Sequence, residues 1–511
     1  MKSDSYYTVK EMKFNLVDDP WIKVIGKPKQ SLRSFFADLT NTGFCGNAIE
    51  KIAMLRFMLS LTHAAIEIPD EKAWNALTPE IISEKVINYL EKHHDCFELF
   101  GEHPFLQFPQ LNTSNKMQDF QTMYPNVSSG NKSVLTHWNL PDFVDISDIP
   151  LLLLRGCGFG FGGKKSDNSI VLSKGYCGKQ NDKGKPASGS AGTLIGFQGY
   201  LHSYLYGTSI LDTIHLNLLT TEDIKGLDFY SEIGRPVWEN MPTGEDCETA
   251  RHYKTTYQGM LLPLDKFFLL FPEDKKIVIT DGISYPTHLT GLRDPALTIY
   301  TEKNKNKAIW AKTSHRPWRE LPALLAFLQP NHNNPSPYFL SYGIGKLPAD
   351  TVIHIWTAGL QVSSNAGEQY VSGKDDYIES DFYFPNIAKD NGDVIRSKFC
   401  NMMTEIESYA KVLYASVNSY FKTMFHAGSA DNAAAAVELF WELMEKDAQM
   451  LLNAACEIEN NDLIPDDLKK RWKKLVFDIY NKYCPRETAR QLLAWSESKP
   501  FAKEKSSKKG K

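Results

Sequence analysis

The chain has 511 residues, 42% of them hydrophobic and 23% charged, an ordinary composition for a globular protein of roughly two to four domains. The net charge of −4 excludes a bulk attraction of the whole chain to nucleic acid, so local basic patches would have to hold an anionic partner. Eight scattered cysteines without a CxxC pair are typical of a reducing compartment and argue against a zinc knuckle. No run approaches the ~18 apolar residues of a membrane span, so we expect a cytoplasmic protein without membrane contact.

The N-terminal part predicts short strands followed by helices. Residues 1–11 are interpreted as a disordered extension, or Met12 is an alternative start, and "FNLVDDPWIKVIG" (14–26) predicts two short strands around an Asp-Asp-Pro turn. The segment 47–68 is apolar on most faces, which predicts a buried helix. A second helix is predicted over 79–93.

A glycine run follows, in "RGCGFGFGGKK" (155–165), after a short helix or strand at "DISDIPLLLLRG". Gly158, Gly160 and Gly163 have dinucleotide-fingerprint spacing, but no apolar helical period follows them, and a lysine stands where a P-loop needs Ser or Thr. Two interpretations remain. The loop is either a solvated surface loop or a backbone that approaches a ligand closely, with six lysines against two aspartates over 164–185 to attract an anion.

The middle of the chain predicts a helix over 193–219 and then mostly strands and loops from 225 to about 385. One helix, "WRELPALLAFL", is predicted among those strands. The strands include "KKIVITDG", "ALTIYTEKNKNKAIWAK" and "TVIHIWTAGLQV".

Glycine and proline become rare after about residue 393, and four helices joined by short turns are predicted, the later three over 432–457, 465–482 and 486–497. One face of the first helix carries the apolar series Met402, Ile406, Tyr409, Leu413, Val417, Tyr420 and Met424. The predicted fold class is therefore α+β, with a mixed N-terminal domain of helices, short strands and long loops before a C-terminal four-helix bundle. The predicted segments are a disordered extension (1–11), the mixed domain (12–390), the bundle (391–498) and a basic disordered tail (499–511).

Three charged segments each allow two interpretations. The strip 301–320 has six Lys/Arg against two Glu with tryptophans between them, which suits either a nucleic-acid backbone or a solvated hairpin. "LKKRWKKL" (468–475) is either a phosphate track or a solvated helix face. The acids Asp375, Asp376, Glu379 and Asp381 could hold magnesium, or form a solvated or salt-bridged turn. No histidine accompanies a serine or cysteine in a nucleophile context, so no catalytic residue is predicted.

The order of motifs resembles the CasA family, the large subunit of the type I-E CRISPR surveillance complex Cascade. The resemblance covers nearly the whole chain and ends in the helical bundle. It rests on "NLVDDPWIKV", "EHPFLQF", "GFGFGGK", "GTLIGFQGYLHSYLYGTSILDTIHLNLL" and "HIWTAGLQVSSNAGEQY".

The resemblance implies which residues contact nucleic acid. The glycine loop would approach the minor groove of target DNA at the protospacer-adjacent motif, and a lysine would enter the same groove. A wedge hairpin would open the duplex beside the motif, and a further loop would contact the guide RNA and a neighbouring subunit. The residues implied for the groove are Gly158, Gly160, Gly163 and Lys275 or Lys276; for the wedge, Ser364, Asn365 and Gln369; and for the RNA contact, Leu135, Thr136 and His137.

The resemblance also implies the function, that of a non-catalytic subunit that recognises the motif in double-stranded DNA and starts duplex unwinding for R-loop formation. Its implied partners are CRISPR RNA, the other Cascade subunits, target DNA and the helicase-nuclease of the system. No cofactor or metal is expected, because the region 226–260, where some relatives carry a zinc loop, holds one cysteine, Cys247. The alternatives are a metal-dependent nuclease that uses the acids at 375–381, and a scaffold that does not contact DNA.

Overall fold

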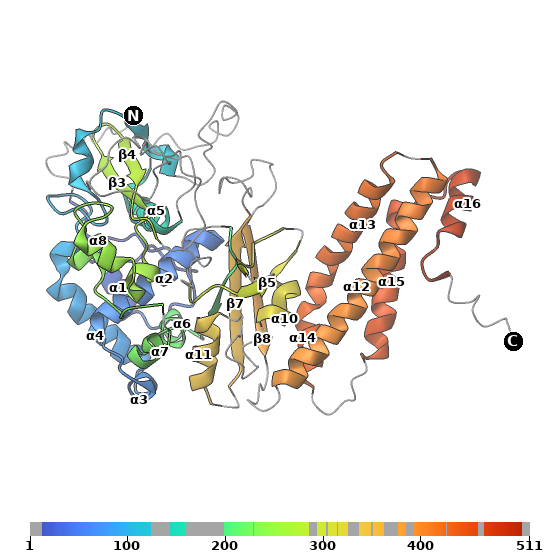
Figure 1. Ribbon diagram of the computed structural model, residues 1–511, viewed down its shortest axis with the longest axis horizontal. Helices are drawn as coiled ribbons and strands as arrows, with labels where there is room; N and C mark the ends of the chain where they lie inside the picture. The colour runs from blue at the N-terminus through green and yellow to red at the C-terminus, as the bar shows by residue number, and fades with distance from the viewer. Residues whose placement is uncertain are drawn as a thin grey trace. The chain divides into compact units, whose positions relative to one another are not determined.

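The computed structural model divides the chain into two compact units (Figure 1). Unit 1 comprises Met1–Thr313, Pro335–Leu347 and His354–Asp381, and unit 2 comprises Ser314–Asn334, Pro348–Ile353 and Phe382–Lys511. The structure describes residues 13–123, 144–159, 199–227, 229–285, 294–302, 305–313, 315–324, 337–348, 351–361, 377–384, 392–425, 427–457 and 464–502.

Unit 1 is built around helix α2 (Ala48–Ala65), which is buried along almost its whole length. Asn47 and Glu50 form a capping box that fixes the start of this helix. Because its apolar residues surround the axis, α2 is packed on several sides, and the helices around it belong to distant parts of the sequence. The other α-helices described in unit 1 are α1 (Leu32–Ala37), α3 (Glu71–Asn75), α4 (Pro79–Lys92), α5 (Ile149–Gly158), α6 (Ile210–Leu216), α7 (Thr221–Lys225), α8 (Glu248–Tyr253), α9 (Tyr257–Leu261) and α11 (Tyr338–Lys346).

A buried ion pair lies beside α2. The Arg56 guanidinium contacts Asp294 at 2.5 Å and donates hydrogen bonds to the carbonyl oxygens of Met260 and Leu261. Burial raises the pKa of Asp294, but the charge and hydrogen bond of Arg56 outweigh burial, so this pKa lies below its ordinary value. The pair therefore stays charged in the core, and Arg56 links α2 both to the end of α9 and to Asp294, which follows β4.

The strands form small antiparallel sheets. In the described residues the orders are β1-β4-β3, β2-β7-β8 and β5-β6. In the first sheet β3 and β4 form a hairpin in which Lys266 pairs with Asp281 and Phe271 with Lys276. The strands are β1 (Gln118–Asp119), β2 (His202–Leu205), β3 (Lys266–Phe271), β4 (Lys276–Asp281), β5 (Ile299–Glu302), β6 (Lys305–Ala308), β7 (Ile353–Leu360) and β8 (Tyr377–Phe384).

Three sequence predictions in unit 1 are wrong. Over 225–385, where the sequence predicts mostly strands and loops with one helix, the chain also forms the helices α8, α9 and α11. Residues 14–26 form single bridges with distant residues instead of two strands of their own, for example Asn15 with Glu98. Within the segment 193–219 predicted as a helix, residues 202–205 form strand β2, and the helix α6 begins only at Ile210. All four residues of β2 are buried, and a short apolar run buried on both faces has the same pattern in a strand as in a helix.

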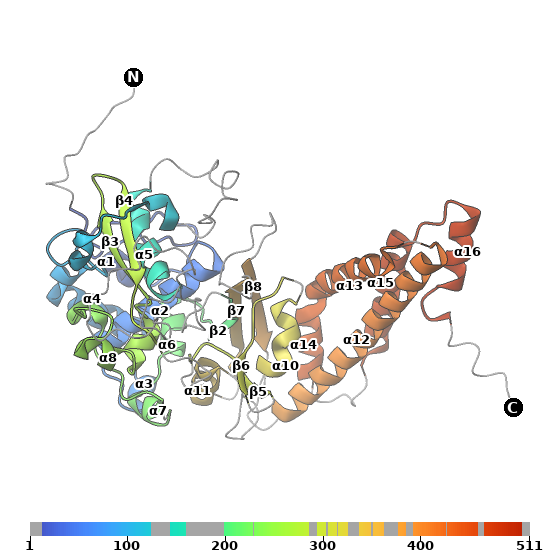
Figure 2. The same cartoon turned by 45° about the horizontal axis from the view of Figure 1, so that its top comes forward.

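Unit 2 is mainly helical. Its described α-helices are α10 (Leu321–Leu324), α12 (Gly392–Thr423), α13 (Ser429–Met444), α14 (Ala448–Cys456), α15 (Asp466–Tyr483) and α16 (Ala489–Glu497). Figures 1 and 2 both show α12, α13 and α15 side by side. The single helix predicted over 432–457 is two helices, because the 3₁₀ turn Glu445–Asp447 separates α13 from α14.

The apolar face predicted for the first bundle helix is confirmed. From Met402 to Tyr420 the members of that series are buried in α12, and Met424 is half-buried. Trp472 of α15 is also buried, and its ring lies edge-on to the Tyr409 ring at 5.8 Å. In the part of the chain with described coordinates, no helix is long and apolar enough to span a membrane.

Candidate nucleic-acid interface

Helix α5, which leads into the glycine run, packs against the base of the β3–β4 hairpin. The Cys157 carbonyl accepts a 2.8 Å hydrogen bond from the Asp265 N–H, just before β3. A Cβ on Gly156 would lie 2.6 Å from Cζ of Phe268, and a Cβ on Gly158 would lie 3.3 Å from Cδ of Pro263. The first glycines of the run therefore allow a helix to approach a strand closely, a packing role.

The structure places Gly158 in the core and not on a surface. It is buried in the last turn of α5, beside Pro263 at the base of the hairpin. The hairpin tip lies beyond the six residues of β3, roughly 20 Å away at about 3.3 Å per residue. Gly160 and Gly163 lie outside the described residues.

The two candidate lysines differ in their surroundings. Lys276 is half-buried at the start of β4, where its ammonium contacts Asp119 of β1 at 2.5 Å. Lys275 is exposed and has a φ of +52°. Its carbonyl accepts a 3.1 Å hydrogen bond from the Phe120 N–H, and none of the described residues contacts its ammonium. The left-handed backbone of a non-glycine residue costs about 1–3 kcal/mol and is found mostly where function or surrounding structure requires it.

The base of the same hairpin holds a second Lys–Asp pair, which sequence reasoning missed. The Lys266 ammonium lies 2.8 Å from Asp281 and 3.9 Å from Asp265, and all three side chains are buried. Burial lowers the pKa of Lys266, but the two carboxylates outweigh burial and raise this pKa above its ordinary value. The signal was present in the sequence, since two apolar runs around a Pro-Glu-Asp-Lys turn predict a hairpin whose outer ends carry Lys and Asp.

The remaining candidate residues are outside the described part of the chain. This applies to the residues that the family resemblance implies for the wedge and for the RNA contact, and also to the lysine-rich stretch 164–185. These residues are Leu135, Thr136, His137, Ser364, Asn365 and Gln369.

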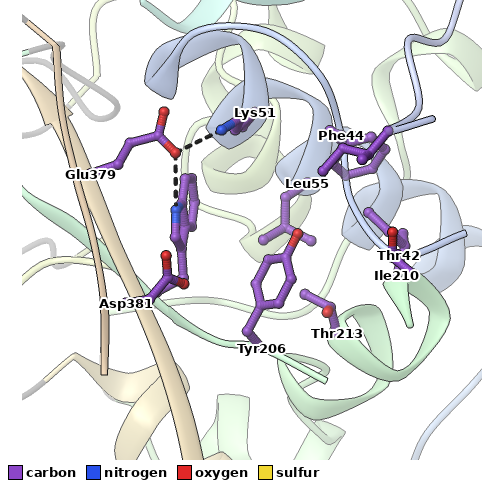
Figure 3. Close-up of a pocket in the computed structure, with 11 residues that line it drawn as sticks. Thr42, Phe44, Lys51, Leu55, Tyr206, Ile210, Thr213, Glu379 and Asp381 are labelled. Carbon is purple, nitrogen blue, oxygen red and sulfur yellow. Dashed lines mark hydrogen bonds and ion pairs between the residues drawn. The ribbon is translucent and has the colours of Figure 1, made fainter. Parts of the chain in front are cut away.

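Glu379 and Asp381, the two described acids of the cluster, form ion pairs and hydrogen bonds with side chains of unit 1. Glu379 and Asp381 are two residues apart in β8, so their side chains project from the same face of the strand. The Glu379 carboxylate contacts the Lys51 ammonium at 2.7 Å and accepts a 3.3 Å hydrogen bond from the Trp356 indole N–H, as Figure 3 shows. Asp381 lies 2.7 Å from Nε2 of His354. A carboxylate held by a lysine is a poorer magnesium ligand, which favours the salt-bridged interpretation. Asp375 and Asp376 lie outside the described residues.

The tryptophans of the basic segments are not exposed for stacking on bases. Trp318 is fully buried in unit 2, where its ring lies 5.7 Å from that of Trp441. Trp310 is half-buried and lies edge-on to Tyr200 at 5.0 Å. Trp472 belongs to the bundle core. Aromatic residues that stack on the bases of a single strand need exposed rings. The burial of these tryptophans therefore favours a solvated hairpin for the strip 301–320 and a solvated helix face for 468–475.

Comparisons with known proteins agree with the motif order. The family model of the CRISPR-associated protein Cse1 matches residues 15–482. Comparison with curated protein sequences finds no match. The fold is similar to that of Thermobifida fusca Cse1, with a TM-score of 0.73 at 15% identity over 95% of this chain and 96% of that one.

Two further solved structures have the same fold. Thermus thermophilus CasA (Cse1) gives a TM-score of 0.69 at 16% identity over 95% of this chain and 97% of that one. A chain of a CRISPR RNA-guided surveillance complex gives 0.69 at 15% identity over 95% and 98%. These identities show the fold alone, whereas the family model spans most of the sequence. The predicted resemblance to the CasA family is confirmed, and the chain belongs to the CRISPR-associated Cse1 family.

Proposed function

We propose that the chain is the large, non-catalytic subunit of a CRISPR RNA-guided surveillance complex. The observation that carries this proposal is the Cse1 family match over residues 15–482, together with a fold shared with a chain of such a complex. In this role the subunit recognises the protospacer-adjacent motif in double-stranded DNA and starts unwinding for the R-loop. It then helps recruit the helicase-nuclease. The guide RNA supplies the specificity for the remaining target sequence.

Between the two candidate lysines, Lys275 is the better groove contact. Its exposed ammonium has no partner among the described residues, whereas Asp119 already neutralises that of Lys276. The Phe120 N–H holds the Lys275 backbone in its left-handed conformation, so the tip is ordered before DNA arrives. A preordered donor loses less conformational entropy on binding, and the narrow minor groove admits a single extended side chain.

The test is binding of the assembled complex to duplexes with randomised bases beside a guide-matched sequence. Lys275→Ala should reduce the preference for motif-bearing over scrambled duplexes by about tenfold, the cost of roughly one lost base contact. Lys276→Ala is the matched control, because it removes the same side chain from the neighbouring position and should change the preference less than about threefold. Gly160→Asp, which places a negative charge in the glycine run, should also reduce the preference.

Two other functions predict different outcomes in this experiment. A scaffold that does not contact DNA predicts equal preference for all variants. A magnesium-dependent nuclease predicts cleavage by the chain itself, lost on Asp375→Ala with Asp376→Ala. The contacts of Glu379 with Lys51 and Trp356 favour a structural role for that part of the acidic cluster. Cleavage scored in the same samples separates the nuclease from the recognition subunit.

A further inference from the structure

Unit 1 contains a cavity of about 320 Å³ beside strand β8. Its volume lies at the lower end of the range for small-ligand sites, about 300–1,000 Å³. Figure 3 shows its two walls: Glu379 and Asp381 stand on one side, and Phe44, Thr42 and Ile210 stand on the other, with Tyr206 between them. These walls come from β8 and from segments more than a hundred residues earlier in the chain.

The charges of the cavity favour a cation. Lys51 and Glu379 neutralise each other through their 2.7 Å contact. Asp381 then remains as the carboxylate of the cavity that no lysine or arginine of the described residues contacts; its side chain is 53% exposed, and its hydrogen-bond partner is the His354 imidazole. An anion would be repelled by Asp381, and an apolar ligand would remove water from this carboxylate without replacing its hydrogen bonds.

The shape of the lining favours a flat cation on an apolar stem. Leu55, Phe44 and Ile210 are buried apolar residues that can hold a chain of methylenes. The Tyr206 and Trp356 rings, whose centroids lie 6.3 Å apart, line the same cavity as Asp381 and offer aromatic surface to a ligand there. A guanidinium satisfies both requirements, since it stacks on aromatic rings and donates a pair of parallel hydrogen bonds to a carboxylate.

We propose that this cavity binds a guanidinium group, with Asp381 as its counter-ion and the Tyr206 and Trp356 rings beside it. Two sources offer this chemistry: an arginine side chain presented by a protein partner, or a free arginine-like small molecule. A lone arginine side chain should bind with a dissociation constant on the order of 1 mM, because so few atoms contribute, whereas a dedicated small-molecule ligand should bind much more tightly.

The experiment titrates the full-length chain with Nα-acetyl-arginine amide and follows the Trp356 indole N–H by NMR, assigned with Trp356→Phe. The matched control ligand is Nα-acetyl-citrulline amide, which has nearly the same shape and no charge. We expect saturable shifts with the arginine compound and binding at least about tenfold weaker with the citrulline compound, because the charge-assisted hydrogen bonds are lost. Millimolar binding identifies a partner's side chain as the source, and micromolar binding identifies a small molecule.

A pair of variants completes the test. Asp381→Asn keeps the shape of the side chain and removes its charge, so it should weaken binding of the arginine compound by about tenfold. Asp478→Asn makes the same change at an exposed position of α15 and should leave binding unchanged. Equal binding of the two compounds by the unmodified chain, or no saturable shift with either, would overturn the proposal, and neither result depends on how the variants fold.

Discussion

The β3–β4 hairpin carries a Lys–Asp pair at each end, and the two pairs lie in opposite surroundings. At the base, Lys266 and Asp281 are directly opposed across the strands, with side-chain exposures of 4% and 3%. At the tip, Lys276 is directly opposed to Asp119 of β1, with exposures of 39% and 65%. The cross-strand geometry is the same, whereas burial differs, and the base has a second carboxylate, Asp265, 3.9 Å from its lysine.

The difference in burial decides how much each ion pair contributes to the stability of the fold. A buried pair that loses one partner leaves an uncompensated charge in the core, which is strongly destabilising. An exposed pair contributes about 0–1 kcal/mol, because water solvates either partner alone. The tip pair can therefore be removed at little cost to the fold, whereas the base pair cannot.

The largest effect should come from breaking the buried pair. Lys266→Met leaves the carboxylates of Asp281 and Asp265 without their cation and should reduce the local free energy of unfolding by about 3–5 kcal/mol. Hydrogen exchange of the β3 and β4 amides measures this change. The double variant with Asp281→Leu should recover part of the loss, and a single variant as stable as the unmodified chain would remove the distinction between base and tip.

An intermediate effect should come from the backbone at the base. Gly282 donates its N–H to the Asp265 carbonyl at 2.7 Å, and a Cβ there would collide with the Leu264 carbonyl oxygen. Gly282→Ala should therefore destabilise the hairpin by about 1–3 kcal/mol, as overpacking does elsewhere. Gly345→Ala in α11 is the matched control, because its Cβ would meet no atom within 4 Å. Equal protection of the hairpin amides in both variants would show that the base tolerates a side chain.

The smallest effect should come from the exposed pair. Lys276→Ala should change the free energy of unfolding of the hairpin by less than about 1 kcal/mol, and Asp119→Ala should behave alike. The same exchange measurement checks both variants beside Lys266→Met. A loss comparable to that of Lys266→Met would mean that the tip pair is structural, and the distinction between tip and base would disappear.

Periodicity predicted the parts of the fold whose burial follows a simple repeat. The apolar face of α12 fits a helix that is buried on one side. The apolar residues on all sides of α2 fit a helix that is buried all round. Periodicity failed at His202–Leu205, where burial on both faces removes the alternation that marks a strand. The break between α13 and α14 was missed because the 3₁₀ turn continues the helical pattern with no proline or glycine.

The candidate site was less predictable, because its character depends on contacts between distant residues. Nothing near Gly158 in the sequence reveals that Pro263 lies against it. In the sequence the cluster that contains Glu379 and Asp381 allows either a metal site or a salt-bridged turn, and only the fold brings Lys51, 328 residues before Glu379, to it. For the same reason Lys275 and Lys276 are equivalent in the sequence, and Asp119 makes them different only in the folded chain.

The ion pair between Arg56 and Asp294 joins residues that are 238 positions apart. At a synthesis rate of about 5–20 residues per second, α2 emerges roughly 10–50 s before the segment that neutralises its arginine. During that interval the helix exposes apolar residues on most of its circumference with no partner from the later part of the chain. Unit 1 is therefore expected to complete its core late in translation, and until then the apolar surface of α2 is a site where the nascent chain can aggregate.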